Sequence, residues 1–332
     1  MTTATHRPLI PAHRPPARVR CRSRVAGVVT ALLVAVLPTG LAACGGDSKP
    51  ARRGADVPVG TTTPSDGEGR SVRPSPGCES APPTAASGDA QTLDVGGVER
   101  TYLLASPKGR DPAPLIILLH GMGSSGADVS RASGLPTQAS AAGAVVVAPD
   151  AVGRPTMWRP GAEGPDADFL DALVAHAEAR HCIDTNRVGI VGFSVGAVFA
   201  STYGCSRQDR VAAVVTVEVD TPGPCSRPMP ILAFHGTADP VVAYSAPPGS
   251  MPLGGGAGTE ANLAAWAKIS RCATTPATTE ISGKVTRIEW PRCADDSEVV
   301  LYKIIGGGHT WPDEPPDATA RVVAFLGRHS LR

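Results

Sequence analysis

Ser194 lies in the pentapeptide Gly192-Phe193-Ser194-Val195-Gly196, directly after a β-branched run that is typical of a strand. Small residues that are compatible with a helix follow it. A serine on a sharp strand-to-helix turn can act as a nucleophile, because flanking glycines remove side chains that would clash there. A hydroxyl is nevertheless a weak nucleophile without an adjacent base. The pentapeptide therefore indicates catalysis only if the chain also supplies a base and an acid.

A base and an acid both follow Ser194 in the chain. His309 lies in IIGGGHTWP and Asp239 in FHGTADPVV, each just past an apolar run. Asp239 could accept the Nδ1 proton of His309 and so fix the tautomer of the ring. Plainer interpretations are a surface-loop histidine and an Asx turn before Pro240. The order Ser194, Asp239, His309 is that of α/β-hydrolases, and it favours a catalytic triad.

An oxyanion site needs two backbone N–H donors. We expect Val195, the residue after the nucleophile, to supply one of them, and Met122 in the loop LLHGMGSSG to supply the other. The alternative for this Gly-rich loop is a phosphate cradle, which the missing GxxxxGK[ST] pattern disfavours. His120 is expected to support the loop through a bond to the backbone, without a chemical role.

The predicted elements explain how these loops would meet. Apolar runs typical of strands buried on both faces lie at residues 114–120, 144–150, 187–193, 211–219, 230–236 and 298–305. Helical segments are predicted at 167–181, 194–205, 260–272 and 317–329. Two short antiparallel strands joined at Gly96-Gly97 come first. This alternation predicts an α/β fold, a mostly parallel sheet with helices on both faces, whose ligands bind at the carboxyl ends of the strands.

Six segments resemble an extracellular esterase family that includes poly(3-hydroxybutyrate) depolymerases, feruloyl esterases and acetyl xylan esterases. They are LLHGMGSS, APDAVG, DADFLDALV, CIDTNRVGIVGFSVGA, FHGTADPVV and GGGHTWP. The resemblance covers roughly residues 90–328. It implies the α/β-hydrolase fold with Ser194, Asp239 and His309 as the triad.

The chain departs from the family pattern at two positions. Ala197 stands where a second glycine commonly follows the serine, and Ala167 replaces one residue of a family DDVxFL segment. Asp168 then has two interpretations. In the first it starts a helix or supports the site loops, and in the second it lies on a solvated helix face.

Two tryptophans are candidates for the substrate pocket. Trp311 follows His309 by two residues, and Trp158 lies in the loop after the second buried strand. For Trp311, packing under the loop is an equal alternative. Residues 244–258 have the Gly- and Pro-rich composition of a mobile rim, whose motion the sequence does not reveal.

Cysteine usage indicates an exported protein. Of the 8 cysteines, Cys21 and Cys44 belong to the N-terminal region discussed next, which leaves an even set typical of disulfides. We expect Cys272 to pair with Cys293, because both lie in one C-terminal insertion. The pairing of Cys78, Cys182, Cys205 and Cys225 stays open. No CxxC or His-spaced pair occurs, which disfavours a zinc site, and no metal or cofactor is expected.

The N-terminus is typical of a bacterial lipoprotein. Residues 1–24 carry arginines and no acid, an apolar run too short to span a bilayer follows, and the run ends in Leu41-Ala42-Ala43-Cys44. An ordinary export signal is the alternative. We predict a signal peptide over 1–43, lipidation at Cys44, a disordered Gly/Pro/Ser/Thr-rich tether over 44–88 and a catalytic domain over 89–332.

The composition excludes some classes of function. The formal net charge is +1 and only 18% of residues are charged, so a nucleic-acid surface is not expected. The sequence predicts a secreted, lipid-anchored serine esterase on polyester, feruloyl or acetyl-sugar esters, held at the outer face of a bacterial membrane. Alternatives are an acyltransferase on envelope glycans or lipids and a non-catalytic lipoprotein that binds a glycan or polymer. The acyl group and the oligomeric state stay open.

Overall fold

The computed structural model describes residues 71–80, 86–245, 257–313 and 317–332, and the structural statements below refer to these residues. The predicted signal peptide, Cys44 and most of the predicted tether lie outside them, as do residues 246–256 of the predicted rim. None of the described helices is both long and apolar enough to cross a membrane.

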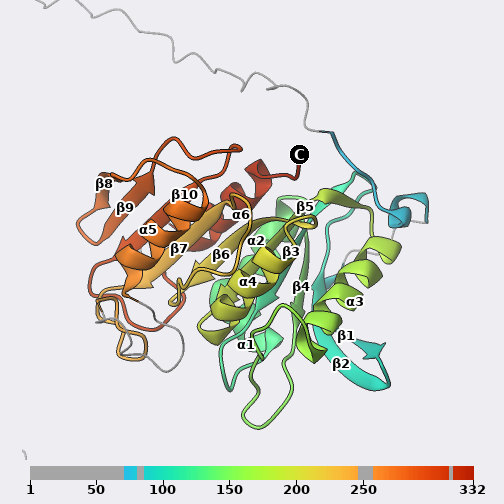
Figure 1. Cartoon of the computed structure of the whole chain (residues 1–332). Helices are drawn as coiled ribbons and strands as arrows, with labels where there is room; N and C mark the ends of the chain where they lie inside the picture. The colour runs from blue at the N-terminus through green and yellow to red at the C-terminus, as the bar shows by residue number, and fades with distance from the viewer. Residues whose placement is uncertain (1–70, 81–85, 246–256, 314–316) are drawn as a thin grey trace, which may run out of the picture. The chain divides into compact units, whose positions relative to one another are not determined.

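One sheet organises the described chain (Figure 1). Its strand order is β1-β2-β4-β3-β5-β6-β7-β10-β9-β8. The central strands are parallel: β4 (Val145–Pro149), β3 (Ala113–Leu119), β5 (Ile183–Phe193), β6 (Val211–Val217), β7 (Ile231–Gly236) and β10 (Val299–Ile304). Antiparallel strands complete each edge: β1 (Ser87–Val95), β2 (Val98–Ala105), β8 (Ala277–Ser282) and β9 (Val285–Trp290).

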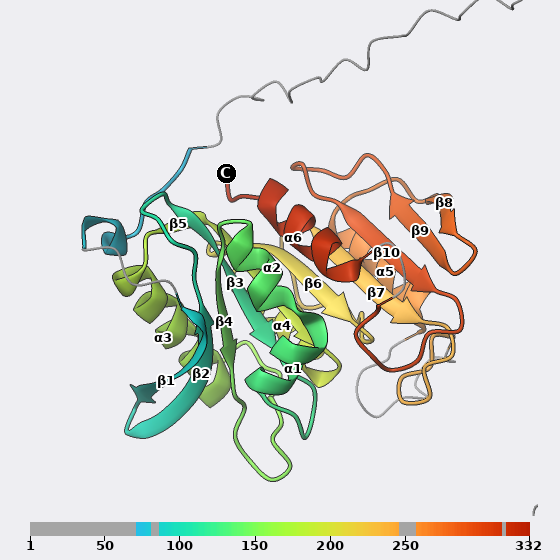
Figure 2. The ribbon, with the colours of Figure 1, turned by 180° about the vertical axis from the view of Figure 1, so that it is seen from behind.

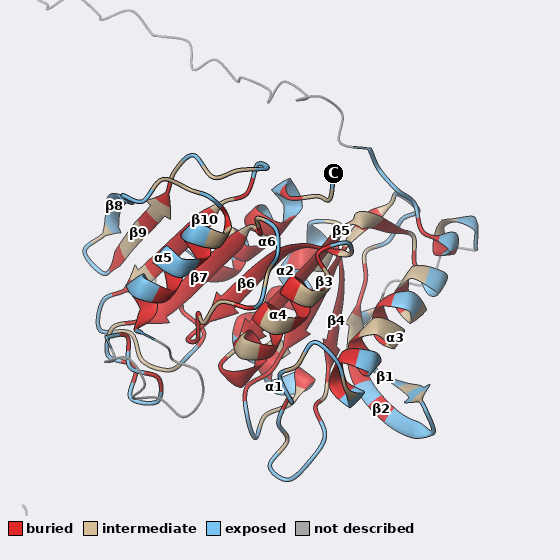
Figure 3. Ribbon diagram, in the orientation of Figure 1, coloured by how far each residue is buried: buried red, intermediate tan, exposed pale blue. Residues whose placement is uncertain are grey.

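Helices cover both faces of the sheet, which confirms the predicted α/β architecture (Figures 1 and 2). One face carries α3 (Pro165–Arg180), α4 (Val195–Ser206) and α5 (Thr259–Ile269), and the other carries α1 (Gly126–Ser133), α2 (Leu135–Ala141) and α6 (Ala318–Arg328). The central strands are therefore buried on both sides, as Figure 3 shows. This burial explains their unbroken apolar runs.

The central strands end in register at their carboxyl edge. The positions paired there are Leu119 with Gly192, Phe193 with Val217, Val217 with Phe234, and Gly236 with Ile304. The loops that follow these strands consequently start side by side, and they include those that carry Ser194, Asp239 and His309. This edge is where a doubly covered parallel sheet binds its ligands.

The chain before β1 differs from the predicted tether. Residues Pro76–Glu79 form a short 3₁₀ helix, η1, and Pro74 forms a β-bridge with Asp184. Ser75 lies within this docked segment, since its Oγ donates to the carbonyl of His181 at 2.9 Å and its N–H donates to Ile183. Within the described residues, contacts with the domain thus extend back to Ser71, before the predicted boundary at residue 89.

Three disulfides join the described chain. Cys272–Cys293 is the pair predicted from the sequence, and the pairs Cys78–Cys182 and Cys205–Cys225 settle the pairing that the sequence left open. Cys78 is in η1 and Cys182 directly precedes β5, so the first disulfide fastens the docked segment to the amino end of that strand. Such a set of disulfides is typical of an extracytoplasmic protein.

Candidate active site

Ser194 occupies a strained turn between β5 and α4. Its backbone angles are φ 56° and ψ −126°, a region that residues other than glycine rarely adopt. A Cβ on Gly192 would lie 2.2 Å from the carbonyl oxygen of Gly196, and a Cβ on Gly196 would lie 2.5 Å from that of His120. Both glycines are therefore required by packing, and the turn holds Ser194 at the start of a helix.

The structure brings Ser194, Asp239 and His309 together in one hydrogen-bonded chain. The Nδ1 of His309 lies 2.7 Å from Oδ2 of Asp239, and its Nε2 lies 2.9 Å from Oγ of Ser194. A carboxylate only accepts, so the ring proton belongs on Nδ1, and Nε2 is left to accept the proton of the serine hydroxyl. The ring of Phe193 flanks His309, with 5.1 Å between ring centroids.

Hydrogen bonds between two loops set the distance from Asp239 to His309. The N–H of Ala238 donates to the carbonyl of Gly307 at 2.9 Å, and the N–H of Gly306 donates to Oγ1 of Thr237 at 2.8 Å. The loops also approach closely, because a Cβ on Gly236 would lie 2.3 Å from the oxygen of Gly307. The glycines of the HGTAD and GGGH segments thus let the acid loop and the histidine loop join.

The carboxylate of Asp239 is buried and amply hydrogen-bonded. Its Oδ1 accepts the backbone N–H groups of Val241 at 2.7 Å and Val242 at 2.9 Å. Burial acts to raise the pKa of Asp239, but the hydrogen bonds from His309, Val242 and Val241 outweigh it, so the pKa lies below its usual value. Asp239 is thus an anion at neutral pH and can stabilise a protonated His309.

Two backbone amides beside Ser194 are free to bind an oxyanion. Among the described residues, no hydrogen bond is donated by the N–H of Met122 or of Val195. The loop of Met122 lies against Ser194, since a Cβ on Gly121 would lie 3.2 Å from Cβ of Ser194. Val195 opens helix α4, whose N-terminus favours negative charge. Both predicted donors therefore flank the serine.

His120 holds the Met122 loop from inside the molecule. Its Nε2 accepts the N–H of Ala151 at 2.9 Å, and its Nδ1 lies 2.6 Å from the carbonyl oxygen of Gly121. A ring that accepts at Nε2 must donate from Nδ1, so His120 is neutral. Burial lowers its pKa, in agreement with this tautomer. The expected supporting bond to the backbone is present.

The two tryptophans expected to line a pocket are buried instead. Trp158 is fully buried, stacks on Phe199 and donates to the carbonyl of His120 at 3.0 Å. Trp311 is 8% exposed, and its indole N–H donates to Oγ1 of Thr319 at 3.0 Å. Each indole N–H thus donates to an acceptor inside the protein, and Trp158 supports the backbone at His120. For Trp311 the structure matches the alternative of packing under its loop.

The acid that supports the site loops is Asp166 and not Asp168. Asp168 is exposed on α3, whereas Asp166 is 2% exposed. The carboxylate of Asp166 accepts Arg100 Nη2 at 2.9 Å and the N–H of Arg159 at 2.9 Å, which fixes the loop that follows β4. The only signal in the sequence was the position of Asp166 directly after Pro165 at the start of the helix.

Ala197 does not disturb the turn. It is fully buried and packs with Val219 and Val242. The methyl group that replaces the family's second glycine therefore fills space between the helix and the loops after β6 and β7.

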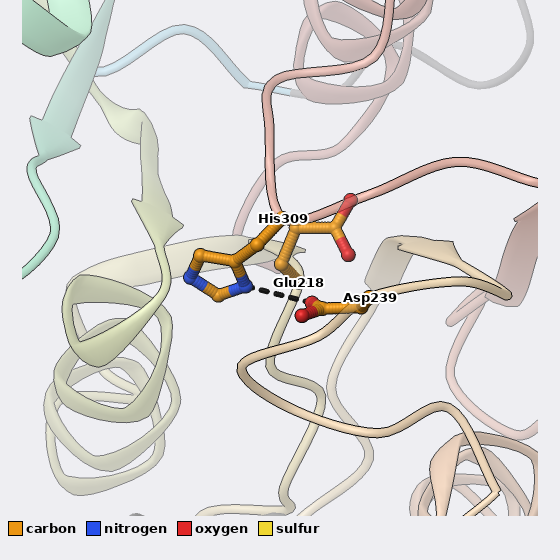
Figure 4. A group of neighbouring side chains, drawn as sticks. All are labelled: Glu218, Asp239 and His309. Atoms are coloured by element: carbon orange, nitrogen blue, oxygen red, sulfur yellow. Dashed lines mark hydrogen bonds and ion pairs between the residues drawn. The ribbon is translucent and has the colours of Figure 1, made fainter. Parts of the chain in front are cut away.

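Glu218 also reaches this centre, although the sequence analysis did not single it out. It follows β6, is 1% exposed and has φ 64°, a left-handed conformation. Figure 4 shows its side chain beside Asp239 and His309, and their ligand atoms lie within 4.8 Å of one another. A cation could bridge such a group, but hydrogen bonds within the protein account for all three side chains.

Comparisons with known proteins relate the chain to esterases. No family model matches the chain. The NocK protein of Nocardia uniformis subsp. tsuyamanensis, which bears the name of an esterase, is 29% identical over 275 residues, 70% of this chain and 77% of that protein. Feruloyl esterase D of Neurospora crassa is 29% identical over 264 residues, 73% of this chain and 84% of its own length. The solved acetyl xylan esterase of Aspergillus awamori has a TM-score of 0.55 at 15% identity, over 72% of this chain and 99% of that one.

These similarities bear out two expectations. The sheet has the α/β-hydrolase fold, and the chain resembles feruloyl and acetyl xylan esterases, as predicted.

Proposed function

We propose that this chain, a serine carboxylic ester hydrolase of the α/β-hydrolase fold, cleaves its ester through an acyl-enzyme on Ser194. The observation that supports this most directly is the chain of hydrogen bonds from Ser194 through His309 to Asp239. Nucleophile, base and acid each follow a different strand of one sheet edge.

In the proposed reaction, Oγ of Ser194 attacks the ester carbonyl carbon while its proton passes to Nε2 of His309. Asp239 keeps the other ring proton on Nδ1 and stabilises the imidazolium. The N–H groups of Val195 and Met122 bind the oxyanion. When the tetrahedral intermediate collapses, Nε2 returns the proton to the departing alcohol. Water then repeats the steps on the acyl-serine and releases the acid.

The relatives favour two kinds of substrate, feruloyl esters and acetylated xylan. Feruloyl esterase D and the acetyl xylan esterase carry such substrates in their names. Polyester, the third class expected from the sequence, has no such relative among those described above. We therefore propose feruloyl or acetyl-sugar esters as the substrates to test first.

We further propose that the enzyme works outside the cytoplasm on a lipid anchor. The disulfides support an extracytoplasmic location. The anchor rests on the sequence around Cys44, whose thiol would carry the lipid. Mass spectrometry of the N-terminal peptide, in wild type and Cys44→Ser, tests it.

The test of function is hydrolysis of p-nitrophenyl acetate and of a feruloyl ester by the full chain. We expect Ser194→Ala to lower kcat at least about a thousandfold, because the nucleophile is lost. Ser201→Ala is the matched control: this hydroxyl lies on the same helix and has no hydrogen-bond partner among the residues that the structure describes. Equal turnover by Ser194→Ala and wild type would refute the proposal, provided that both variants fold.

A further inference from the structure

A buried histidine lies beneath the triad. Nδ1 of His235 lies 2.9 Å from Oδ2 of Asp220, and its Nε2 lies 2.9 Å from the carbonyl oxygen of Val242. Nδ1 also lies 2.9 Å from Oγ1 of Thr259, a hydroxyl that can donate or accept. The carboxylate and the carbonyl oxygen only accept, so both ring nitrogens carry protons and the ring is an imidazolium. Burial acts to lower the pKa of His235, but the hydrogen bond and charge of Asp220 outweigh it and raise the pKa to about 9.

The positive ring faces two carboxyl groups. Its Nε2 lies 3.6 Å from Oδ2 of Asp239 and 3.7 Å from Oε2 of Glu218. Glu218 also accepts the N–H of Gly236 at 3.0 Å through Oε2, and its carboxyl group lies beside that of Asp239, with ligand atoms within 4.8 Å. Two carboxyl groups can share a hydrogen bond only if one of them carries a proton.

Glu218 is the carboxyl group that holds this proton. In the described part of the chain, Asp239 accepts three N–H groups, which stabilise its anion, whereas Glu218 accepts one. Burial raises the pKa of Glu218 to about 8, against the charge of His235 and the bond from Gly236. The left-handed backbone of Glu218 indicates that its placement is maintained against a local conformational cost.

The groups that face Glu218 come from several elements. They are His235 and Asp239 from β7 and its loop, His309 and Asp313 from the loop after β10, and Lys284 from the turn before β9. Asp220 acts through His235. A cavity of about 330 Å³ lies between Glu218 and the residues of this loop and turn, so water can reach its edge.

We propose that Glu218, as a neutral acid, and His235, as an imidazolium, are positioning residues that hold Asp239 ionised and oriented toward His309. The inference rests on the proposed function. Glu218 donates a hydrogen bond to the carboxylate of Asp239, and His235 supplies the compensating charge within 4 Å. Neither residue touches the substrate.

The proposal predicts a pH effect that depends on one proton. Above about pH 8 Glu218 loses this proton. It then no longer donates to Asp239 and instead becomes a second anion beside that carboxylate. The value of kcat should therefore fall through pH 8 in the wild-type enzyme. Glutamine mimics the neutral acid, since its amide can donate to Asp239 and accept from Gly236, and it carries no proton to lose.

The experiment compares Glu218→Gln and Glu218→Met in the full chain, with kcat and KM for p-nitrophenyl acetate measured from pH 6 to 10. Both variants place a long side chain on the same left-handed backbone, so its cost is matched. We expect the Gln variant to lack the fall near pH 8 and to keep a kcat about tenfold above that of the Met variant, with similar KM. Glu298→Gln is the control, because Glu298 precedes β10 whereas the loop of His309 follows that strand. It should keep the wild-type dependence of kcat on pH.

Two results would overturn the inference. One is a Gln variant that still shows the wild-type fall near pH 8, and the other is equal kcat in the Gln and Met variants. The ¹⁵N signals of the His235 ring give a reading that does not depend on catalysis: an imidazolium is expected at pH 7, and a neutral ring would also contradict the proposal. Loss of the proposed function itself would be recognised separately, as activity that survives Ser194→Ala.

Discussion

At the scale of single residues, three histidines lie at or after the carboxyl ends of three different strands, and each has different hydrogen-bond partners. His120 donates once and accepts once, His309 links an acid to a hydroxyl, and His235 faces acceptors on both sides. Residue type alone does not distinguish these roles. The partners that the fold supplies decide which ring is a support, which is a base and which is a buried cation.

His120 is expected to act on the oxyanion site through one peptide group. Its Nδ1–H holds the carbonyl of Gly121, and the same peptide carries the N–H of Met122 on its other side. We predict that His120→Ala lowers kcat about tenfold and changes KM little, because a loosened donor stabilises the transition state less. Steady-state kinetics on p-nitrophenyl acetate measure both constants.

The control for this substitution is His176→Ala on helix α3, whose ring contacts Arg180 and Tyr102. Its kcat should equal that of the wild type. An unchanged kcat in His120→Ala, with an unchanged melting temperature, would show that the loop keeps its shape without the ring.

At the scale of elements, close contacts at glycines fix the site as much as hydrogen bonds do. The start of α4 touches the end of β3 through Gly196, where an added Cβ would also lie 2.7 Å from the oxygen of Leu119. Backbone atoms cannot move aside as a flexible side chain can. The turn that carries Ser194 and the loop that carries Met122 therefore keep a fixed separation only while residue 196 lacks a side chain.

This contact predicts a large effect from one methyl group. Gly196→Ala should lower the free energy of unfolding by about 1–3 kcal/mol, although alanine favours helices, because the methyl group overlaps backbone atoms. Activity should fall as well, since the two oxyanion donors are pushed apart. Urea unfolding and esterase kinetics are the measurements.

Gly283→Ala is the matched control, because a Cβ there would meet no atom within 4 Å. It should leave both stability and kcat close to the wild-type values. Wild-type stability in Gly196→Ala would mean that α4 can shift without cost. The contact at residue 196 would then not fix the separation between the turn and the Met122 loop.

The central elements were predictable because burial leaves a clear pattern in the sequence. The apolar runs of β3 and β4 and the spacing of α3 were recognised to within a few residues. Strand β8 was missed because its residues are almost all exposed, so burial imposes no periodicity. Helices α1 and α2 were missed because their Ala- and Ser-rich segments carry few large apolar residues.

The candidate site was predictable where a motif marks it and not where only packing does. Ser194, Asp239 and His309 stand in recognisable segments at strand ends. Glu218 lies inside an apolar run, VAAVVTVEV, that was interpreted only as strand. Its role depends on its φ of 64° and on neighbours from other strands, which no local pattern reveals. An acid inside an apolar run was the one available signal.

At the scale of the whole molecule, a disulfide connects distant parts of the chain. Cys78 and Cys182 are 104 residues apart, whereas Cys272 and Cys293 are 21 apart. In the chain-entropy model a longer closed loop restricts the unfolded state more. The first disulfide should therefore contribute more to stability than the third.

We predict that Cys78→Ser with Cys182→Ser lowers the free energy of unfolding by about 4 kcal/mol. The same change at Cys272 and Cys293 should lower it by about 1 kcal/mol less. The measurement is urea unfolding of the two double variants and the wild type. If removal of the Cys272–Cys293 disulfide lowered the free energy of unfolding more than removal of Cys78–Cys182, chain entropy would not be the dominant contribution. Esterase activity of the folded fraction should persist in the Cys78/Cys182 variant, since neither residue lies near Ser194.

The docked segment contacts the domain at the end of the sheet opposite to the catalytic edge. The carbonyl of Ser71 accepts from Asn186 at 2.7 Å, beside the amino end of β5, and Ser194 follows the carboxyl end of the same strand. A strand of 11 residues is about 35 Å long. The docked segment therefore lies at the far end of β5 from Ser194 and does not border the catalytic edge, which leaves that edge open to substrate.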